Sequence, residues 1–325
     1  MYKKYINNTY KMLFKNIINF IKKFNNKNII FKIFVLFILL ILVCFASNKK
    51  EGFAQHKKYT VKNNDEIFSD YYANMYDNIL LDKTKYNTEI DEISKIVDYN
   101  EFNSILDVGC GTGEIVNILN DQPLGNKTPN ILGLDKSQEM INVAKRKYPN
   151  NQYVVGDIND NNLFQNNFFT HILCLNQTIY YIKDKEQFFN NCYNLLLPNG
   201  YLIIHLVDRN NFNSISTATN LNPLVNPDNY SIKNINNSII NYNDVTYTTK
   251  FSIFPNDFKS NANAVFKETI EEKISGNILE NVHNLYMPTQ QETLELAKKS
   301  NFKFIDVINL SKNNYKYEYI YVLQK

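Results

Sequence analysis

The chain has little glycine, almost no arginine and no tryptophan. Nine glycines occur in 325 residues, and the two arginines are Arg146 and Arg209. The formal net charge of +3 conceals an asymmetry, because residues 63–325 contain 22 basic against 31 acidic residues. Nucleic-acid-binding surfaces need a basic face. The acidic body and the scarcity of arginine therefore argue against nucleic acid as a partner.

Cysteine and histidine are scarce as well, with four of each. Cys44, Cys110, Cys174 and Cys192 show neither metal-ligand spacing nor a dense disulfide pattern. The histidines form no HExxH-type pair. The sequence therefore predicts neither a metal site nor a disulfide framework.

One long hydrophobic run lies near the N-terminus. Residues 33–46 are continuously apolar, and an extension back to Ile29 admits only Lys32. These eighteen residues are at the short end of a membrane span, whereas fourteen alone would suit the core of a signal peptide. The segment before the run is unusually long for a signal peptide. We therefore favour a retained single-pass transmembrane anchor over 28–47, with cleavage near Ser47 as the alternative.

The segments on either side of this run are polar. Within residues 1–27, apolar residues recur at helical spacing and several lysines lie off that stripe. This pattern predicts a basic amphipathic segment suited to an anionic membrane surface. Residues 48–64 are predicted to be a linker, and a single folded domain is predicted over 65–325.

In the first part of this domain, apolar strands alternate with helices. Strands are predicted at 104–108, 130–135, 152–157, 169–176 and 201–208, and helices at 66–82, 87–98, 114–120, 137–147 and 184–197. Ser137 is the predicted N-cap of its helix. The alternation predicts an α/β fold with a mostly parallel sheet covered by helices on both faces.

The later part of the domain breaks the alternation. The segments 245–254, 264–273 and 278–287 have the period-two pattern of antiparallel strands, which predicts a β insert within 208–288. A helix capped by Thr289 follows, and the chain closes with the strand-like segments FKFIDVINL and YEYIYVLQ. These two segments predict a closing hairpin on the main sheet.

Three of the nine glycines occur at alternate positions in one short stretch, ILDVGCGTGEI at 105–115. Glycine is favoured where the backbone turns sharply or where a ligand approaches it closely. The stretch lies between a predicted strand and a predicted helix, the arrangement that cradles a nucleotide-like ligand. Its G-x-G-x-G spacing departs from the G-x-G-x-x-G of dinucleotide folds, which disfavours a nicotinamide oxidoreductase.

Acidic residues accompany three successive predicted strands. Asp107 precedes the first glycine, Asp135 ends the second strand, and Asp157 follows the third strand after Gly156. Carboxylates at these positions suit a cationic cofactor, whereas a pyrophosphate would be repelled by them.

Taken together and in order, these segments resemble the class I S-adenosylmethionine-dependent methyltransferases. The match runs through residues 105–115, 131–135, 156–158, 172–181 and 195–204, and the overall resemblance covers roughly 66–325. It implies a Rossmann-like, seven-stranded, mostly parallel sheet, S-adenosylmethionine as the cofactor, and methyl transfer as the reaction.

The resemblance also implies roles for the acidic residues. Asp135 would accept hydrogen bonds from both ribose hydroxyls. Asp157 would bind the adenine amino group, with the Ile158 backbone beside it. Asp107 would orient the loop and the amino end of the cofactor. A solvated carboxylate at a strand end is the alternative interpretation for Asp135 and Asp157.

Further positions match the family's cofactor site. The backbone at Gly109, Gly111 and Gly113 would pass close under the cofactor. Asn176 and Gln177 follow the fourth strand, beside the expected position of the methionine portion. Because asparagine is frequent throughout this chain, the alternative is that these two residues have no role in the site.

The stretch YYANMYDNILLDKTKYNTEIDEI at 71–93 resembles the N-terminal helices of small-molecule methyltransferases, including sugar-amine N-methyltransferases. In that group the corresponding stretch covers the cofactor. Tyr72, Tyr76 and Tyr86 are the matching residues here, and Tyr72 is assigned to the cofactor site. The alternative is that these tyrosines only pack helices together.

Methyl transfer mainly needs proximity and alignment, sometimes with a base that removes a proton from the acceptor. His205 near the end of the fifth strand and Tyr180 after the fourth are the predicted catalytic residues. Asp208, Tyr181 and His283 are further candidates. Each of the five also has a purely structural interpretation.

These observations predict a membrane-anchored methyltransferase that acts on a small molecule or another non-nucleic-acid acceptor. The alternative is a non-catalytic domain that binds S-adenosylmethionine and scaffolds a partner. Because the cofactor is made in the cytosol, we expect the catalytic body to face the cytosol.

Overall fold

The computed structural model describes residues 28–47, 57–79, 82–97, 102–121, 129–212, 237–255, 257, 259, 261–313 and 315–325, without the side chains at 35, 39 and 42–47. The chain divides into two compact units, residues 1–56 and residues 57–325. The predicted amphipathic segment over 1–27 lies outside the described residues.

The first unit contains one described helix, α2, which spans Ile29–Ser47. It coincides with the helix predicted over 28–47. Across the residues that the structure describes, however, no helix is both long and apolar enough to cross a membrane. The transmembrane assignment made from the sequence therefore finds no support in the structure.

The second unit is built on a seven-stranded sheet, as predicted. Its order is β11-β12-β6-β5-β2-β3-β4. The strands β2 to β6 pair in parallel, and β12 and β11 add the predicted antiparallel hairpin at one edge. The bounds are Ser104–Val108 (β2), Asn130–Asp135 (β3), Gln152–Val155 (β4), Phe169–Cys174 (β5), Leu196–Val207 (β6), Lys303–Asn309 (β11) and Glu318–Gln324 (β12).

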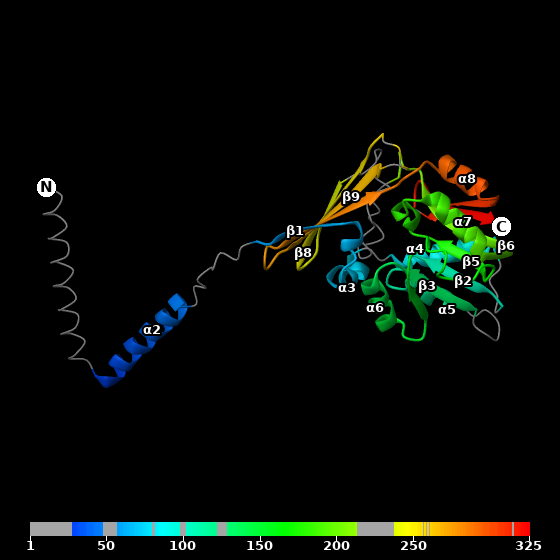
Figure 1. The fold of residues 1–325 in the computed structure, drawn as a ribbon. Helices are drawn as coiled ribbons and strands as arrows, with labels where there is room; N and C mark the ends of the chain where they lie inside the picture. Colours follow the sequence, from blue (N-terminus) through cyan, green and yellow to red (C-terminus); the bar gives the residue numbers. More distant parts are fainter. Residues whose placement is uncertain are drawn as a thin grey trace. The chain divides into compact units, whose positions relative to one another are not determined.

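Helices cover both faces of this sheet (Figure 1). Successive strand residues point to opposite faces, so Leu106 joins a core with Phe188 of α7, whereas Ile105 joins a core with Ile90 of α4. The helices are α3 (Asp70–Ile79), α4 (Lys83–Ser94), α5 (Glu114–Asp121), α6 (Gln138–Lys147), α7 (Lys185–Leu195) and α8 (Gln290–Lys299). The predicted caps are confirmed, because the side chains of Ser137 and Thr289 accept hydrogen bonds from backbone N–H groups in α6 and α8.

A second sheet of five strands is formed mainly by the predicted insert. Its order is β1-β10-β9-β8-β7, with bounds Tyr59–Asn63 (β1), Asn237–Asn241 (β7), Val245–Ile253 (β8), Ala264–Glu272 (β9) and Ile278–Leu285 (β10). A third core cluster packs Tyr72 of α3 and Met140 of α6 against Tyr247 and Ile270 of this sheet. The second sheet is thereby fixed beside α3 and α6.

The strand β1 corrects one sequence-based boundary. Residues 48–64 were expected to form a linker, but Tyr59–Asn63 pairs in parallel with Ile278–Val282 of β10. The partner strand lies more than two hundred residues away along the chain. The local sequence does not predict this pairing, because the pattern of these five residues is common to exposed polar strands.

Candidate active site

A cavity of about 730 Å³ lies where β2, β3, β4 and β5 end. Its wall is completed by α3 and by residues of β9 and β10. The carboxyl ends of parallel strands meet at one edge of an open sheet, which is where ligands bind in such folds. The cavity therefore lies where the sequence places the cofactor.

The glycine loop after β2 forms the base of this cavity. Gly109, Gly111 and Gly113 all adopt positive φ angles, of 73°, 53° and 86°. A Cβ atom at Gly111 would meet nothing within 4 Å, so this position faces open space in the cavity. A Cβ at Gly113 would instead collide with the Tyr153 hydroxyl. Gly113 is therefore needed for packing and, unlike the other two glycines, does not line the cavity.

Asp135, at the end of β3, holds the glycine loop against the start of α6. Its Oδ2 accepts a hydrogen bond from the Gly111 backbone N–H at 2.9 Å, and its Oδ1 accepts one from Ser137 N–H at 2.9 Å. Burial raises the pKa of the Asp135 carboxyl, although these two hydrogen bonds oppose the shift. Each carboxylate oxygen keeps a second lone pair, which is available to a ligand in the cavity.

Asp107, in β2, presents a buried carboxylate to the cavity. The residue is 2% exposed, and its Oδ2 has no hydrogen-bond partner within the described part of the chain. Burial and the nearby charge of Asp135 raise the pKa of Asp107 to about 7. A buried carboxylate without a partner is costly, so a cationic group placed beside it would be stabilised.

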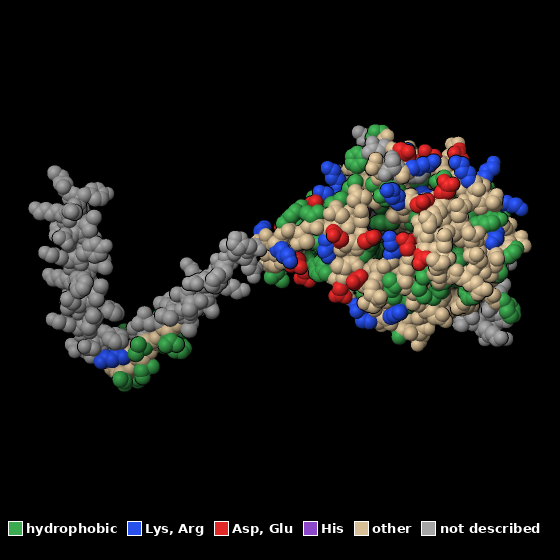
Figure 2. All heavy atoms as spheres, viewed as in Figure 1, with side chains coloured by type: hydrophobic (Ala, Val, Ile, Leu, Met, Phe, Trp, Pro, Cys, Tyr) green, Lys and Arg blue, Asp and Glu red, His purple; other side chains and the backbone are tan. Residues whose placement is uncertain are grey.

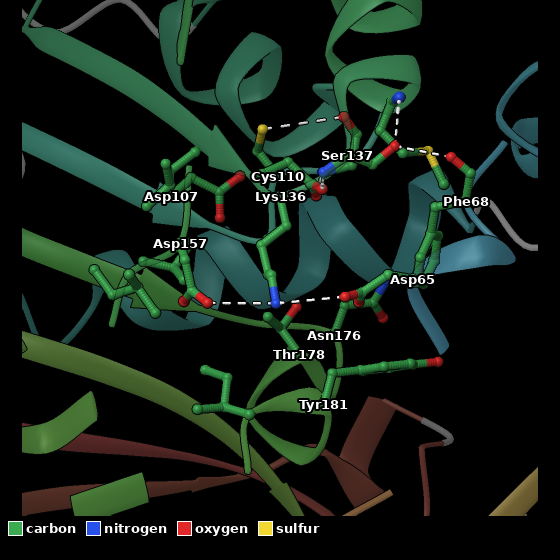
Figure 3. Close-up of a pocket in the computed structure, with 18 of the residues that line it drawn as sticks. Asp65, Phe68, Asp107, Cys110, Lys136, Ser137, Asp157, Asn176, Thr178 and Tyr181 are labelled. Carbon is green, nitrogen blue, oxygen red and sulfur yellow. Dashed lines mark hydrogen bonds and ion pairs between the residues drawn. The ribbon is translucent and has the colours of Figure 1, made fainter. Parts of the chain in front are cut away.

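Asp157, after β4, also lines the cavity. Figure 3 shows Lys136 between Asp157 and Asp65, with its Nζ 3.3 Å from Asp157 Oδ2 and 3.7 Å from Asp65 Oδ2. The other oxygen of Asp157 accepts a hydrogen bond from Asn159 N–H at 2.9 Å. Ile158 is buried and lines the same wall.

The two residues after β5 differ in their relation to the cavity. Asn176 and Gln177 both have left-handed backbones, with φ of 52° and 65°. Asn176 lines the cavity, and its side-chain amide donates a hydrogen bond to the Tyr86 hydroxyl. Gln177 is not among the residues that line the cavity. Two consecutive non-glycine residues in this conformation store strain, which is typical of functional sites.

Comparison with known proteins agrees with this geometry. Residues 106–204 match the family model described as a methyltransferase domain. A protein of Invertebrate iridescent virus 6 named as a methyltransferase, 235L, is 26% identical over 220 residues, which are 65% of this chain and 78% of the viral protein.

Solved structures share the fold. The CcbJ methyltransferase of Streptomyces caelestis aligns with a TM-score of 0.58 at 12% identity, over 80% of this chain and 98% of that one. The structure of CalS10 with S-adenosylmethionine bound, an amino pentose methyltransferase from Micromonospora echinaspora, aligns with a TM-score of 0.51 at 14% identity, over 74% and 90%. The chain carries a class I S-adenosylmethionine-dependent methyltransferase domain. Its cofactor is S-adenosylmethionine.

In this methyltransferase, the helix α3 covers the cavity as the resemblance implied. Tyr72, Tyr76 and Tyr86 all line the cavity. The Thr112 hydroxyl of the glycine loop donates a hydrogen bond of 2.5 Å to Asp77 Oδ1 and so ties α3 to the loop. The three tyrosines therefore belong to the site as well as to the packing of the helices.

The two predicted catalytic residues lie outside the cavity of the methyltransferase. Tyr180 is 1% exposed, and its hydroxyl accepts a hydrogen bond from Val207 N–H at 2.8 Å. His205 is fully buried, with Nε2 3.0 Å from Glu318 Oε2 and Nδ1 3.7 Å from Glu89 Oε1. Because β6 continues to Val207, His205 lies within the strand and faces the core on the α4 side. We therefore do not include either residue in the site.

Of the other candidates, Tyr181 and His283 line the cavity, and Asp208 does not. His283 Nδ1 is 2.9 Å from the Tyr181 hydroxyl, and its Nε2 is 2.7 Å from Glu268 Oε2. Glu268 was not singled out from the sequence. It is one of three glutamates in β9, AVFKETIEE, with nothing in the pattern to distinguish it from the other two.

Replacing Asp135 by alanine removes the acceptor that holds the glycine loop to α6. Hydrogen bonds to a charged group each contribute about 1.5–3 kcal/mol. We therefore expect Asp135→Ala to weaken S-adenosylmethionine binding by at least about tenfold in calorimetry. Asp121→Ala, at the exposed end of α5, is the matched control and should bind normally. Unchanged affinity in Asp135→Ala would show that the loop does not need this carboxylate.

The binding of S-adenosylmethionine should depend on pH through Asp107. Below pH 7 the carboxyl is protonated, and a cationic ligand can gain its full attraction only if the proton leaves. Affinity should therefore fall as the pH drops below about 7, by up to about tenfold per pH unit. Calorimetry between about pH 6 and about pH 8 measures this, and Asp107→Asn should remove the dependence. An identical pH dependence in the variant would assign it to another group.

Proposed function

We propose that this domain transfers the methyl group of S-adenosylmethionine to a small-molecule acceptor that binds in the same cavity. The observation that carries the proposal is the division of one cavity into two ends of different chemistry. The end at the glycine loop is lined by the carboxylates of Asp107, Asp135 and Asp157. The end under the second sheet is lined by Phe68, Tyr181 and other aromatic residues.

The acidic end fits S-adenosylmethionine. The free lone pairs of Asp135 suit the two ribose hydroxyls, and the Asp157 carboxylate beside Ile158 suits the adenine amino group. Asp107 suits the cationic amino end, because its Oδ2 has no partner among the described residues. Gly111 leaves room for the cofactor above the loop backbone, whereas a Cβ at Gly109 would collide with the Thr178 side chain. When bound, S-adenosylmethionine supplies an activated methyl group.

The aromatic end fits a small acceptor. Small-molecule sites usually occupy about 300–1,000 Å³, and the volume of this cavity, about 730 Å³, lies within that range. The face shown in Figure 2 carries acidic and basic side chains intermingled. That face offers no continuous basic surface for a nucleic acid, which supports a small acceptor.

Methyl transfer is tested with the full-length protein, methyl-labelled S-adenosylmethionine and the small-molecule fraction of a cell extract. We expect the label to appear in an extract compound, and mass spectrometry should show that compound gaining one methyl group. The Asp135→Ala variant is the control for cofactor-dependent transfer. Tight cofactor binding without any labelled product, in small-molecule and protein fractions alike, would favour a non-catalytic scaffold instead.

The location of the protein in the cell stays a prediction from the sequence. If residues 29–46 anchor the chain, the full-length protein should stay in the membrane pellet through both high-salt and alkaline washes, because hydrophobic insertion resists both. Release by salt alone would leave only electrostatic attachment through residues 1–27. A mature chain that begins near Ser47 would identify a signal peptide. Protease accessibility in sealed vesicles would then test whether the domain faces the cytosol.

A further inference from the structure

Three side chains from separate elements form a continuous hydrogen-bonded chain at the aromatic end of the cavity. Glu268 lies in β9, His283 in β10 and Tyr181 in the short 3-10 helix Thr178–Tyr181. The His283 ring lies between the other two, 2.7 Å from the Glu268 carboxylate and 2.9 Å from the Tyr181 hydroxyl. Glu268 and His283 are buried, whereas Tyr181 is 40% exposed. The hydrogen-bonded series of side chains therefore leads from the core to the cavity.

Glu268 is the fixed anion of this chain. Its carboxylate accepts hydrogen bonds from the hydroxyls of Tyr72 and Tyr247, the amide of Asn281 and the His283 ring. Burial alone would raise the pKa of Glu268, but its pairing with His283 and its hydrogen bonds from Tyr247 and Tyr72 lower it below its usual value. The carboxylate is therefore ionised and acts only as an acceptor.

An ionised Glu268 sets the tautomer of His283. The carboxylate can only accept, so Nε2 carries the hydrogen and Nδ1 of the neutral ring is left as an acceptor. The Tyr181 hydroxyl must then donate to Nδ1. Desolvation by the surrounding protein raises the pKa of Tyr181 well above its usual value, although part of the side chain faces the cavity, so the hydroxyl keeps its proton at rest. Tyr181 can thus pass a proton to His283 as it accepts another from the cavity.

We propose that Tyr181, His283 and Glu268 form a proton relay that deprotonates an amine acceptor before methyl transfer, an inference that rests on the proposed function. The acceptor ammonium gives a proton to the Tyr181 oxygen while the Tyr181 proton moves to His283 Nδ1. The imidazolium that forms is paired with Glu268 and later releases its proton to solvent. The freed nitrogen lone pair forms the bond to the methyl carbon, while the sulfur keeps the electron pair of the broken bond.

The surroundings favour an amine over a neutral acceptor. While His283 is neutral, the pair it forms with Glu268 has a net charge of minus one, which attracts a cation. The rings of Phe68 and Phe266 also line this end, with centroids 6.1 Å and 5.4 Å from the His283 ring. Aromatic faces add to the attraction of a cationic group.

The tautomer of His283 tests the relay without any acceptor. Long-range proton–nitrogen NMR spectra of the full-length protein, assigned with His283→Gln, should show that the neutral ring carries hydrogen on Nε2 and none on Nδ1. Glu268→Gln should lose this preference, because the amide can also donate. A proton on Nδ1 of the neutral ring in the wild-type protein would overturn the relay, since Tyr181 would then have no acceptor to pass its proton to.

Kinetics test the relay in turnover. The probes are a panel of aliphatic primary amines and the alcohols that match them in shape. We expect methylated amines, with kcat falling about a hundredfold in Tyr181→Phe and His283→Gln, the lower range for loss of acid–base catalysis. The KM for S-adenosylmethionine should change little. Tyr71→Phe is the matched control, because Tyr71 is exposed and hydrogen-bonded to Glu272 rather than to the relay.

The pH profile separates a relay from a merely structural role. Because the relay must take up a proton, wild-type kcat/KM should rise with pH. Glu268, Tyr181 and Tyr72 face His283, and Tyr247 contacts Glu268. This rise should be lost in His283→Gln. Failure of the wild type to bind S-adenosylmethionine would refute the proposed function itself. If cofactor binding and methyl transfer are normal, either of two results would refute the relay alone. One is unimpaired turnover in Tyr181→Phe and His283→Gln, and the other is methylation of the alcohols in place of the amines.

Discussion

The site of this methyltransferase depends on the pair of hydrogen bonds that Asp135 accepts from Gly111 and Ser137. These bonds connect the glycine loop, whose backbone is left-handed, to the start of α6. The ends of β2 and β3 and the start of α6 therefore meet at one carboxylate. Together with burial, the same carboxylate raises the pKa of the neighbouring Asp107. One structural contact thereby shapes the cofactor end and also sets its electrostatics.

The second sheet completes the wall of the cavity, which the first sheet leaves open. A parallel sheet with helices on both faces offers a binding edge, but it leaves that edge open to solvent on the side away from the loop. The strands β9 and β10 close it with aromatic residues and with the buried Glu268. The contact of Tyr72 with both the cavity and Glu268 couples this insert to the covering helix α3. The hydrogen bond from Tyr72 to Glu268 therefore both holds α3 over the cavity and stabilises the buried carboxylate.

Buried charge occurs in two places with different consequences. Away from the cavity, Lys85 and His205 surround Glu318. Burial would raise the pKa of Glu318, but these two neighbours lower it to about 2. Lys85 pairs with both Glu318 and Glu89 in this cluster, and none of these side chains lines the cavity, so we assign the cluster to the fold. Glu268 is instead paired with a histidine that contacts a cavity residue, and this difference makes the second cluster chemically useful.

The parallel sheet, the caps at Ser137 and Thr289, and the cofactor loop could be predicted from the sequence, because each depends on residues close together in the chain. Strand and helix periodicity, cap chemistry and glycine spacing are local properties, and they placed Asp107 and Asp135 correctly at strand ends. The folded chain was needed to reveal the pairing of β1 with β10, the burial of His205 and Tyr180, and the contacts among Tyr181, Glu268 and His283. Those outcomes depend on strand register and on contacts between distant segments. A single residue of register decides whether a side chain enters the core or the cavity.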